Sequence, residues 1–245
     1  MPISNMKPDN PVFWNTQKFD SIPEDLDWLS FPELNRYQQF RFPKRQNDWL
    51  LGRWAAKNLL SNLLIYSDTL PFRELSILNE ESGAPFVIWK DQRLGGSLSI
   101  SHRSDCAIAA FCFDPELSIG IDLEEIEAKS RGFVEDYFTE SEARMVLALP
   151  IEEQALAASL LWSGREAIVK ALKIGLRLDT RQIAFNLPSL KSNEDWQPIE
   201  ILECPSEAKN LKLFWRKLNG ALITLAIKNN HPGHDFSPEG IQQIL

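Results

Sequence analysis

Two short motifs carry three carboxylates and one cation at spacings that favour metal and phosphate binding. Asp122 and Glu124 are two residues apart in a segment that we expect to be a strand, and Glu166 and Lys170 are four residues apart in a segment that we expect to be a helix. At these spacings the two side chains of each pair share one face of their element. If the two faces meet, the three carboxylates and the lysine can surround a metal ion and a phosphate.

A single acidic residue at a strand end or on a helix face is usually only solvated, so each of these carboxylates alone is weak evidence. The combination is more specific. Magnesium prefers hard oxygen ligands and often keeps substrate phosphates in its shell, so two or three convergent carboxylates are a suitable ligand set. Such an ion would neutralise a pyrophosphate and promote phosphoryl-type transfer.

Other catalytic frameworks are not supported by the sequence. Ser101 and His102 are adjacent in an expected strand, where neighbouring side chains point to opposite faces, so His102 is badly placed to act as base for Ser101. No Gly-x-Ser-x-Gly elbow, phosphate-binding loop or dinucleotide fingerprint is present. We expect Ser101 and His102 to contact a ligand separately, and phosphate to be bound by side chains and metal.

The composition is that of an ordinary globular protein with 245 residues, of which 44% are hydrophobic. A net charge of -8 argues against a general nucleic-acid binder. No apolar run approaches the roughly 18 residues of a membrane helix, and the first residues lack the apolar core of a signal peptide, so the sequence predicts a cytoplasmic protein without a membrane partner. Three cysteines without metal-site spacing are expected to be reduced thiols: Cys106, Cys112 and Cys204.

One segment departs from the acidic average. Between Arg36 and Lys57 there are six basic residues against one acidic residue, Asp48. The segment can be a solvated helix face followed by a basic loop, or a surface for anionic phosphate or an acidic partner protein. The six basic residues are Arg36, Arg41, Lys44, Arg45, Arg53 and Lys57.

Hydrophobic periodicity predicts a long helix over Gln46–Leu64, followed by four short strands that we expect to form a meander against it. The expected strands are Glu74–Leu78, Pro85–Trp89, Ser97–His102 and Ala107–Phe113.

A second half is expected to begin with a strand over Leu117–Leu123. Thr139 starts a helix with a capping-box pattern, a longer helix covers Ile151–Lys173 and leaves at Gly175, and three more strands follow. We place the domain boundary near Glu116, giving halves of residues 1–116 and 117–245, and we see no convincing residue-by-residue repeat. The three strands are Ile199–Glu203, Leu211–Arg216 and Ala221–Ile227, and the stretch His231–His234 is expected to be a loose tail.

At these residues the chain resembles the 4′-phosphopantetheinyl transferases, in particular their single-chain, Sfp-type branch. The resemblance covers about Arg36 to Ile227, and its motifs follow the family's order at plausible spacing. They are Ser99-Ile100-Ser101-His102, Gly120-Ile121-Asp122-Leu123-Glu124, Tyr137-Phe138-Thr139-Glu140-Ser141-Glu142, Trp162 through Lys170, and Gly175-Leu176.

The resemblance implies an enzyme that moves the phosphopantetheine arm of coenzyme A onto a serine of an apo acyl or peptidyl carrier protein and releases adenosine 3′,5′-bisphosphate. Such carriers serve fatty-acid, polyketide or non-ribosomal peptide assembly. By matching position, Asp122, Glu124 and Glu166 would hold Mg²⁺, with Mn²⁺ as an alternative. Glu166 would take the serine proton and Lys170 would balance charge on the phosphate.

By the same resemblance, Arg36, Ser101 and His102 would contact coenzyme A. Arg165 stands where the family more often has lysine, and we expect it to bind phosphate bidentately. The family's usual phosphate-binding lysine is replaced by Ala84, and some relatives have arginine at the position of Asn79. We expect the missing charges to be replaced from the basic segment, by Arg36, Lys44, Arg45 or Arg53.

The fold that the resemblance implies is α+β: two similar halves in one chain, each a small, mostly antiparallel sheet packed with a long helix, with the active site in the cleft between them. A monomer is expected. Two other functions fit the same residues. One is a Mg²⁺-dependent pyrophosphohydrolase acting on coenzyme A or nucleotides, and the other is a non-catalytic protein that binds carrier proteins.

Overall fold

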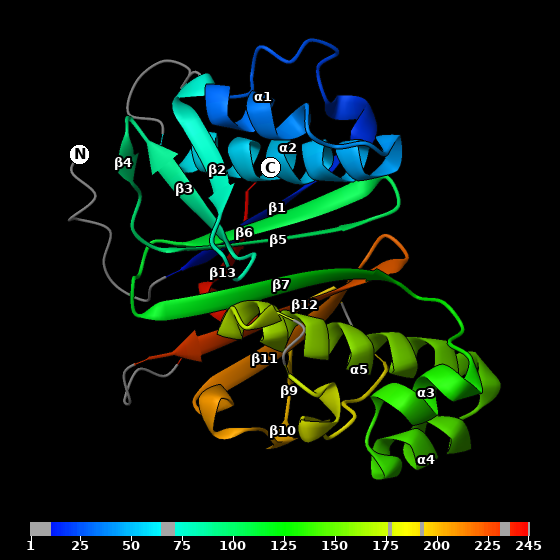
Figure 1. Cartoon of the computed structure of the whole chain (residues 1–245). Coiled ribbons are helices and arrows are strands. Elements are labelled where there is room, and N and C mark those ends of the chain that lie inside the picture. The colour runs from blue at the N-terminus through cyan, green and yellow to red at the C-terminus, as the bar shows by residue number, and fades with distance from the viewer. Residues whose placement is uncertain (1–10, 65–71, 176–177, 192–193, 231–235, 245) are drawn as a thin grey trace. The chain divides into compact units, whose positions relative to one another are not determined.

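The computed structural model describes residues 11–64, 72–175, 178–191, 194–230 and 236–244 (Figure 1). The chain divides into two compact units. The first unit comprises Met1–Leu117 together with Glu239–Leu245, and the second comprises Ser118–Pro238.

Within its described residues, the first unit combines two α-helices with two small sheets. In Figure 1, α2 lies across the sheet that contains β1, β6 and β5. The bounds are β1 Val12–Lys18, α1 Phe31–Tyr37, α2 Pro43–Leu64, β2 Leu75–Asn79, β3 Pro85–Trp89, β4 Gln92–Arg93, β5 Ser97–Arg103, β6 Cys106–Cys112 and β13 Ile241–Gln243.

Helix α2 begins three residues before the predicted start, at Pro43. Proline is favoured in the first turn of a helix, where its missing N–H costs nothing. Leu51, Ala55 and Leu59 are buried in a core cluster with residues of the sheet, and Leu63 is half-buried beside them. Leu50 and Trp54 are buried in a second cluster. The predicted long helix is therefore confirmed, and it forms the core of the first unit.

The expected single meander is wrong. Strands β2, β3 and β4 form one antiparallel sheet, whereas β5 and β6 form a hairpin in another sheet with the order β13-β1-β6-β5. Gly96 explains the change of sheet, because its φ of 112° turns the chain between β4 and β5 in a conformation that other residues rarely adopt. On its other side β6 pairs with β1, a strand that we did not predict.

Among its described residues, the second unit contains three α-helices and a sheet with the order β7-β12-β11-β9. Helix α5 packs on this sheet, mainly against β12 and β11, and α4 contacts both α3 and α5 (Figure 1). A two-stranded sheet pairs β10 with β8. The bounds are β7 Leu117–Glu125, α3 Arg131–Tyr137, α4 Glu140–Ala148, α5 Ile151–Leu172, β8 Ala184–Phe185, β9 Gln197–Ile199, β10 Ile201–Glu203, β11 Leu211–Leu218 and β12 Ala221–Asn229.

The helix predictions in this unit are largely confirmed. Thr139 is the N-cap of α4 and forms the predicted capping box with Glu142. Helix α5 ends at Leu172, where Lys173 takes a left-handed conformation with φ of 58°. The strand predicted over Ile199–Glu203 is divided between β9 and β10, which pair with different strands.

Each unit contains a buried ion pair of the same design. In the first unit, Glu33 is the third residue of α1, and its carboxylate accepts hydrogen bonds from the backbone and hydroxyl of the N-cap Ser30, and from the backbone N–H of Ile77 in β2. Lys57 of α2 pairs with this carboxylate at 2.6 Å. The Lys57 ammonium also donates to two backbone oxygens, those of Trp28 and Phe72.

The second unit repeats this arrangement. Glu142 is the third residue of α4 and accepts from the backbone and hydroxyl of the N-cap Thr139 and from the backbone N–H of Phe185 in β8. Its cation is Arg165 of α5. Counted from the first residue of each helix, Arg165 has the same position in α5 as Lys57 has in α2. Both helices have 22 residues. The two units are thus similar α+β structures, and a repeat exists that the sequence did not reveal.

The last described strand differs from the expected division of the chain. Strand β13 pairs parallel to β1, with Ile241 opposite Val12, so it belongs to the first unit. The predicted tail over His231–His234, and Leu176 of the Gly175-Leu176 motif, lie outside the described residues. None of the described helices has the length and hydropathy needed to cross a membrane.

Candidate active site

Gly120 allows β7 to lie directly against the backbone of α5. A Cβ atom at this position would lie 2.0 Å from the Ala167 carbonyl oxygen and 2.4 Å from the Ala171 nitrogen, which are helix backbone atoms. No other residue type fits so close an approach. The close packing puts Asp122, on the same strand, within reach of the side chains of α5.

The carboxylate of Asp122 is held from both sides by α5. Its Oδ1 accepts from the ammonium of Lys170 at 2.7 Å, and its Oδ2 accepts from the hydroxyl of Ser163 at 2.8 Å. Lys170 also donates to the carbonyl oxygen of Ile121. The structure therefore brings together two residues that the sequence placed at one site, Asp122 and Lys170, and Asp122 is 5% exposed.

Glu124 and Glu166 complete the acidic group. Glu124 is buried on the same face of β7 as Asp122, and the ammonium of Lys129 lies 3.7 Å from its Oε2. Burial raises the pKa of Glu166, and the negative charges of Asp122 and Glu124 raise this pKa further, whereas Lys170 lowers it. Glu166 thus lies in the field of the other two carboxylates.

The donor set fits magnesium in chemistry. It consists of carboxylate oxygens and contains no imidazole or thiolate. Such a set of oxygen ligands favours Mg²⁺ over softer ions such as Zn²⁺. Burial is the main cause of the raised pKa of Glu166, and a divalent cation would relieve the repulsion from Asp122 and Glu124 that adds to it. Within the part of the chain that the structure describes, no three His, Cys, Asp or Glu side chains are already arranged to hold a metal ion.

Arg165 is not a phosphate contact, and this prediction is wrong. Its side chain is fully buried, pairs with Glu142 and donates to the carbonyl oxygens of Leu161, Thr180 and Ile183. Its guanidinium also lies over two aromatic rings, those of Phe138 and Phe185. Adjacent residues of a helix point in different directions, so Arg165 faces the α4 side while Glu166 faces the acidic group.

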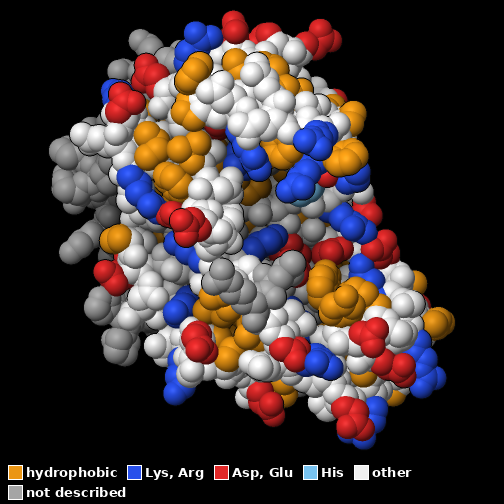
Figure 2. Space-filling model, in the orientation of Figure 1, with side chains coloured by type: hydrophobic (Ala, Val, Ile, Leu, Met, Phe, Trp, Pro, Cys, Tyr) orange, Lys and Arg blue, Asp and Glu red, His pale blue; other side chains and the backbone are white. Residues whose placement is uncertain are grey.

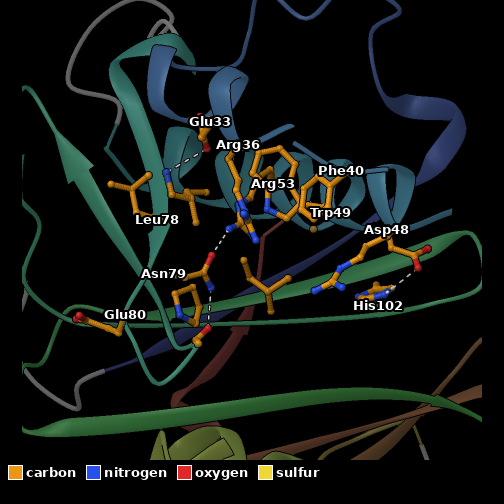
Figure 3. A pocket seen from close by; sticks show the side chains of 16 residues that line it. Glu33, Arg36, Phe40, Asp48, Trp49, Arg53, Leu78, Asn79, Glu80 and His102 are labelled. Carbon is orange, nitrogen blue, oxygen red and sulfur yellow. Dashed lines mark hydrogen bonds and ion pairs between the residues drawn. The ribbon is translucent and has the colours of Figure 1, made fainter. Parts of the chain in front are cut away.

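A pocket of about 1020 Å³ lies in the first unit between α1, α2, β2 and β5 (Figure 3). Figure 3 shows the side chains of Arg36 and Arg53 pointing into the same space, and Lys and Arg side chains gather on this face of the unit in Figure 2. Trp49 and Phe40 form an aromatic wall, and the guanidinium of Arg53 lies 4.6 Å from the centre of the Trp49 ring. The other polar lining residues include Arg45, Asp48, Asn79 and His102.

Arg53 is a buried cation in this pocket. Its exposed fraction is 7%, and desolvation is the main cause that lowers its pKa to about 10; Glu33 raises this pKa and Arg36 lowers it. One amino group donates to the Asn79 side chain at 2.5 Å, while no described residue accepts a hydrogen bond from its buried Nε–H. These features favour an anionic ligand, which would supply both a countercharge and an acceptor.

Ser101 and His102 lie on opposite faces of β5, as predicted. His102 lines the pocket, is partly exposed and lies 3.6 Å from Asp48, measured from Nε2 to Oδ2. Ser101 is buried on the other face and does not line the pocket. The structure therefore brings His102 together with Arg36 and Arg53, and it leaves Ser101 apart from them.

The positions that lack the family's basic residues border this pocket. Gly83 and Pro85, on either side of Ala84, line it, and Asn79 is hydrogen-bonded to Arg53. Of the four basic residues considered as replacements, Arg36, Arg45 and Arg53 line the pocket. Lys44 does not: its ammonium is 2.9 Å from Asp48 and its side chain is 87% exposed.

Three contributors were missed by the sequence analysis. Trp49 does not belong to the apolar residues whose helical spacing predicted the helix over Gln46–Leu64, so it was not considered. Ser163 stands inside the Trp162–Lys170 motif, which was a signal that we did not use. Thr224, which hydrogen-bonds with Ser163, lies in an apolar strand and gives no sequence signal of its own.

Comparisons with known proteins identify one family. Residues 118–223 match the family model of the 4′-phosphopantetheinyl transferase superfamily. The human L-aminoadipate-semialdehyde dehydrogenase-phosphopantetheinyl transferase is 25% identical over 186 residues, which cover 69% of this chain and 58% of the human protein. The 4′-phosphopantetheinyl transferase psf-1 of Bacillus pumilus is 27% identical over 149 residues, covering 61% of this chain and 60% of that protein.

These two matches thus span less than two thirds of the relatives' own length. A shorter relative is covered more completely. The holo-[acyl-carrier-protein] synthase of Streptococcus agalactiae is 33% identical over 89 residues, which are 36% of this chain and 75% of that enzyme. Asp122, Glu124, Glu166 and Lys170 lie inside the segment that the family model matches. Because the chain covers 75% of this synthase at 33% identity, it belongs to the 4′-phosphopantetheinyl transferase superfamily.

Proposed function

We propose that this protein transfers the 4′-phosphopantetheine arm of coenzyme A to a serine hydroxyl of an apo acyl or peptidyl carrier protein, and that it acts as a monomer. The observation that carries the proposal is the acidic group on β7 and α5, in which Asp122 is paired with Lys170 and Glu166 lies in the field of two further carboxylates. Membership of the superfamily supports the same reaction.

Asp122, Glu124 and Glu166 are the residues that would hold Mg²⁺. The bound ion would neutralise the pyrophosphate of coenzyme A and stabilise the charge that develops as the phosphate is transferred. Lys170 contributes a second positive charge from the same helix face as Glu166. Its pairing with Asp122 orients the ammonium group before substrate binds.

Glu166 is the best candidate for the base. The serine oxygen forms a bond to the phosphorus of the phosphopantetheine group, the bond from that phosphorus to the adenosine bisphosphate oxygen breaks, and adenosine 3′,5′-bisphosphate leaves. The serine proton goes to Glu166. A carboxylate whose pKa is raised by burial accepts a proton more readily than an exposed one, and such base catalysis typically contributes about 10²- to 10⁴-fold in rate.

The pocket of the first unit is proposed to bind the phosphorylated adenosine end of coenzyme A. Trp49 and Phe40 offer aromatic surface for a base, and Arg36, Arg53 and His102 offer donors for phosphate oxygens. Ser101 has no place in this proposal, because it lies on the other face of β5.

The direct test is a transfer assay. The protein is mixed with coenzyme A, Mg²⁺ and an apo carrier protein, and mass spectrometry follows the phosphopantetheine increment on the carrier. We expect the increment on the wild-type carrier and none on a carrier whose acceptor serine is replaced by alanine. No increment with several classes of carrier would refute the proposal.

Variants of α5 assign the base. Glu166→Gln should abolish transfer while calorimetry still detects coenzyme A binding. Glu152→Gln, which removes an exposed carboxylate at the start of the same helix, is the matched control and should retain full activity. Release of phosphopantetheine without any carrier would instead indicate a pyrophosphohydrolase, and binding of carrier without turnover would indicate a scaffold.

A further inference from the structure

Thr224 is a buried polar residue in an apolar strand. It is fully buried in β12, between Ile223 and Leu225, and β12 lies next to β7 in the sheet. Its hydroxyl donates to the carbonyl oxygen of Ser163 and lies 2.8 Å from the Ser163 hydroxyl. Burying a hydroxyl is unfavourable unless its hydrogen bonds are made, so a buried threonine that is fully engaged with one residue suggests a specific role.

The number of hydrogens fixes the direction of this network. The hydroxyls of Ser163 and Thr224 have one hydrogen each, whereas the carboxylate of Asp122, paired with Lys170, can only accept. The Ser163 hydrogen therefore goes to Asp122 Oδ2. The Thr224 hydroxyl then acts as the donor to Ser163, whose hydroxyl oxygen and carbonyl oxygen both accept from it.

We propose that Ser163 and Thr224 are positioning residues that fix the carboxylate of Asp122 in its metal-binding orientation. The inference rests on the proposed function, since it assigns a role within the same site. Thr224 orients the Ser163 hydroxyl, and that hydroxyl holds Oδ2 of Asp122. Three elements, β12, α5 and β7, are thereby joined by one chain of hydrogen bonds.

The hydrogen bonds from Lys170 and Ser163 to Asp122 differ in how deeply their donors are buried. Lys170 draws Oδ1 toward itself at 2.7 Å, and this lysine is 27% exposed at its side chain, so it can move. Ser163 and Thr224 are fully buried. When a phosphate draws Lys170 away, or a metal ion takes the place of its ammonium group at Oδ1, the hydroxyl pair keeps the Asp122 carboxylate from rotating. Loss of residues that orient a metal ligand typically costs about 10- to 100-fold in metal affinity.

The test compares four variants with the wild-type protein. Ser163→Ala removes the donor to Asp122 together with the hydroxyl partner of Thr224, and leaves the hydrogen bond from Thr224 to the backbone carbonyl of residue 163. Thr224→Val removes the hydroxyl and keeps the shape, whereas Thr224→Ser keeps the hydroxyl and loses a methyl group. Ser159→Ala, which removes another buried serine hydroxyl of α5 that contacts Glu127 instead, is the control. Thermal unfolding shows whether each variant is folded.

The main measurement is binding of Mn²⁺ in the presence of coenzyme A, followed by electron paramagnetic resonance without any carrier. We expect Ser163→Ala to weaken Mn²⁺ binding about 10- to 100-fold, Thr224→Val to weaken it less, and Thr224→Ser and Ser159→Ala to bind as the wild type does. In the transfer assay, the Mg²⁺ concentration for half-maximal rate should rise in the same order.

Two outcomes would overturn the inference: unchanged Mn²⁺ binding in folded Ser163→Ala, or equal losses in Thr224→Val and Thr224→Ser. If Ser163→Ala does not fold, the two Thr224 variants decide the question. A wild-type protein that binds Mn²⁺ but modifies no carrier would contradict the proposed function alone, whereas a wild-type protein that binds no Mn²⁺ would remove the metal-binding role of Asp122 as well.

Discussion

At the scale of single residues, Arg53 shows most clearly how burial and charge are combined in this protein. Its guanidinium is desolvated and lies beside the aromatic ring of Trp49, yet its charge is retained because the pKa falls only to about 10. A cation in this state has already lost most of its hydration. It can bind an anion without the desolvation cost that an exposed arginine would bear.

We therefore predict that Arg53→Gln weakens coenzyme A binding by about 10- to 100-fold, because a hydrogen bond to a charged group contributes about 1.5–3 kcal/mol. Isothermal titration calorimetry without carrier protein measures this effect. Arg41→Gln removes the same charge from an exposed residue of the basic segment outside the pocket lining and serves as the control. Equal losses in both variants would show that only the overall charge matters.

Arg165 shows where reasoning from residue types fails. It has the same chemistry as Arg53, and its neighbour in sequence is the proposed base, yet it lies buried against Glu142. The capping-box pattern around Thr139 was recognised, but the carboxylate of such a box can also accept a cation from a second helix. The sequence of α4 does not reveal which helix packs against its capping box, so Arg165 could not be predicted as the partner of Glu142.

At the scale of elements, the contact of β7 with α5 determines the geometry of the acidic group. The strand supplies Asp122 and Glu124, the helix supplies Glu166 and Lys170, and Gly120 sets the distance between strand and helix. A methyl group at position 120 would have to displace helix backbone, which cannot move as a flexible side chain does.

Gly120→Ala should consequently lower the free energy of unfolding by about 1–3 kcal/mol or more and also disrupt the Asp122–Lys170 pair. Gly132→Ala is the matched control, because a Cβ atom there meets nothing within 4 Å and α3 gains a better helix former, stabilising the protein by about 0.4–1 kcal/mol. Urea unfolding measures both changes. Wild-type stability and transfer activity in Gly120→Ala would contradict the importance of this contact.

The elements that the sequence predicted best are those with a strong local signal. The boundaries of β3 were predicted without error, and those of α5 to within one residue, since Pro150 precedes this helix and Gly175 follows it. Strand β1 was missed, because its partners β6 and β13 are distant in the chain and leave no local pattern. The expected meander was wrong for a similar reason, because β6 pairs with the distant β1 and belongs to a different sheet from β2, β3 and β4.

The candidate site follows the same rule. The motifs identified Asp122, Glu124, Glu166 and Lys170 as a group, because two periodicities alone were enough to place each pair on one face. The partners that fix this group from within the core, Ser163 and Thr224, depend on the register between α5 and β12. That register results from the packing of α5 on β12, and the sequence of neither element alone reveals it.

At the scale of the whole molecule, the buried ion pair that occurs in each unit is the strongest sign of internal repetition. Glu33 with Lys57, and Glu142 with Arg165, link a capping box, a long helix and a short strand in the same way. Removing one partner of such a pair leaves a buried charge without compensation, which typically costs about 3–5 kcal/mol.

Lys57→Met and Arg165→Met should each lower stability by about that amount, although they lie in different units. Lys44→Met is the control, since Lys44 also belongs to α2 and pairs with a carboxylate, but its side chain is largely exposed and the pair is worth about 1 kcal/mol or less. Chemical unfolding followed by tryptophan fluorescence checks these values. A loss confined to one unit would show that the two pairs are not equivalent in energy.

The pairing of β13 with β1 has a consequence for biosynthesis. A ribosome releases β1 early, together with the helices and strands that pack on it, but it releases Ile241–Gln243 only after all of the second unit has emerged. Until then, one edge of β1 has unpaired backbone groups, which are open to pairing with another chain. Completion of the first unit therefore waits for translation of the second, and β1 is the segment on which a chaperone or a neighbouring nascent chain would act first.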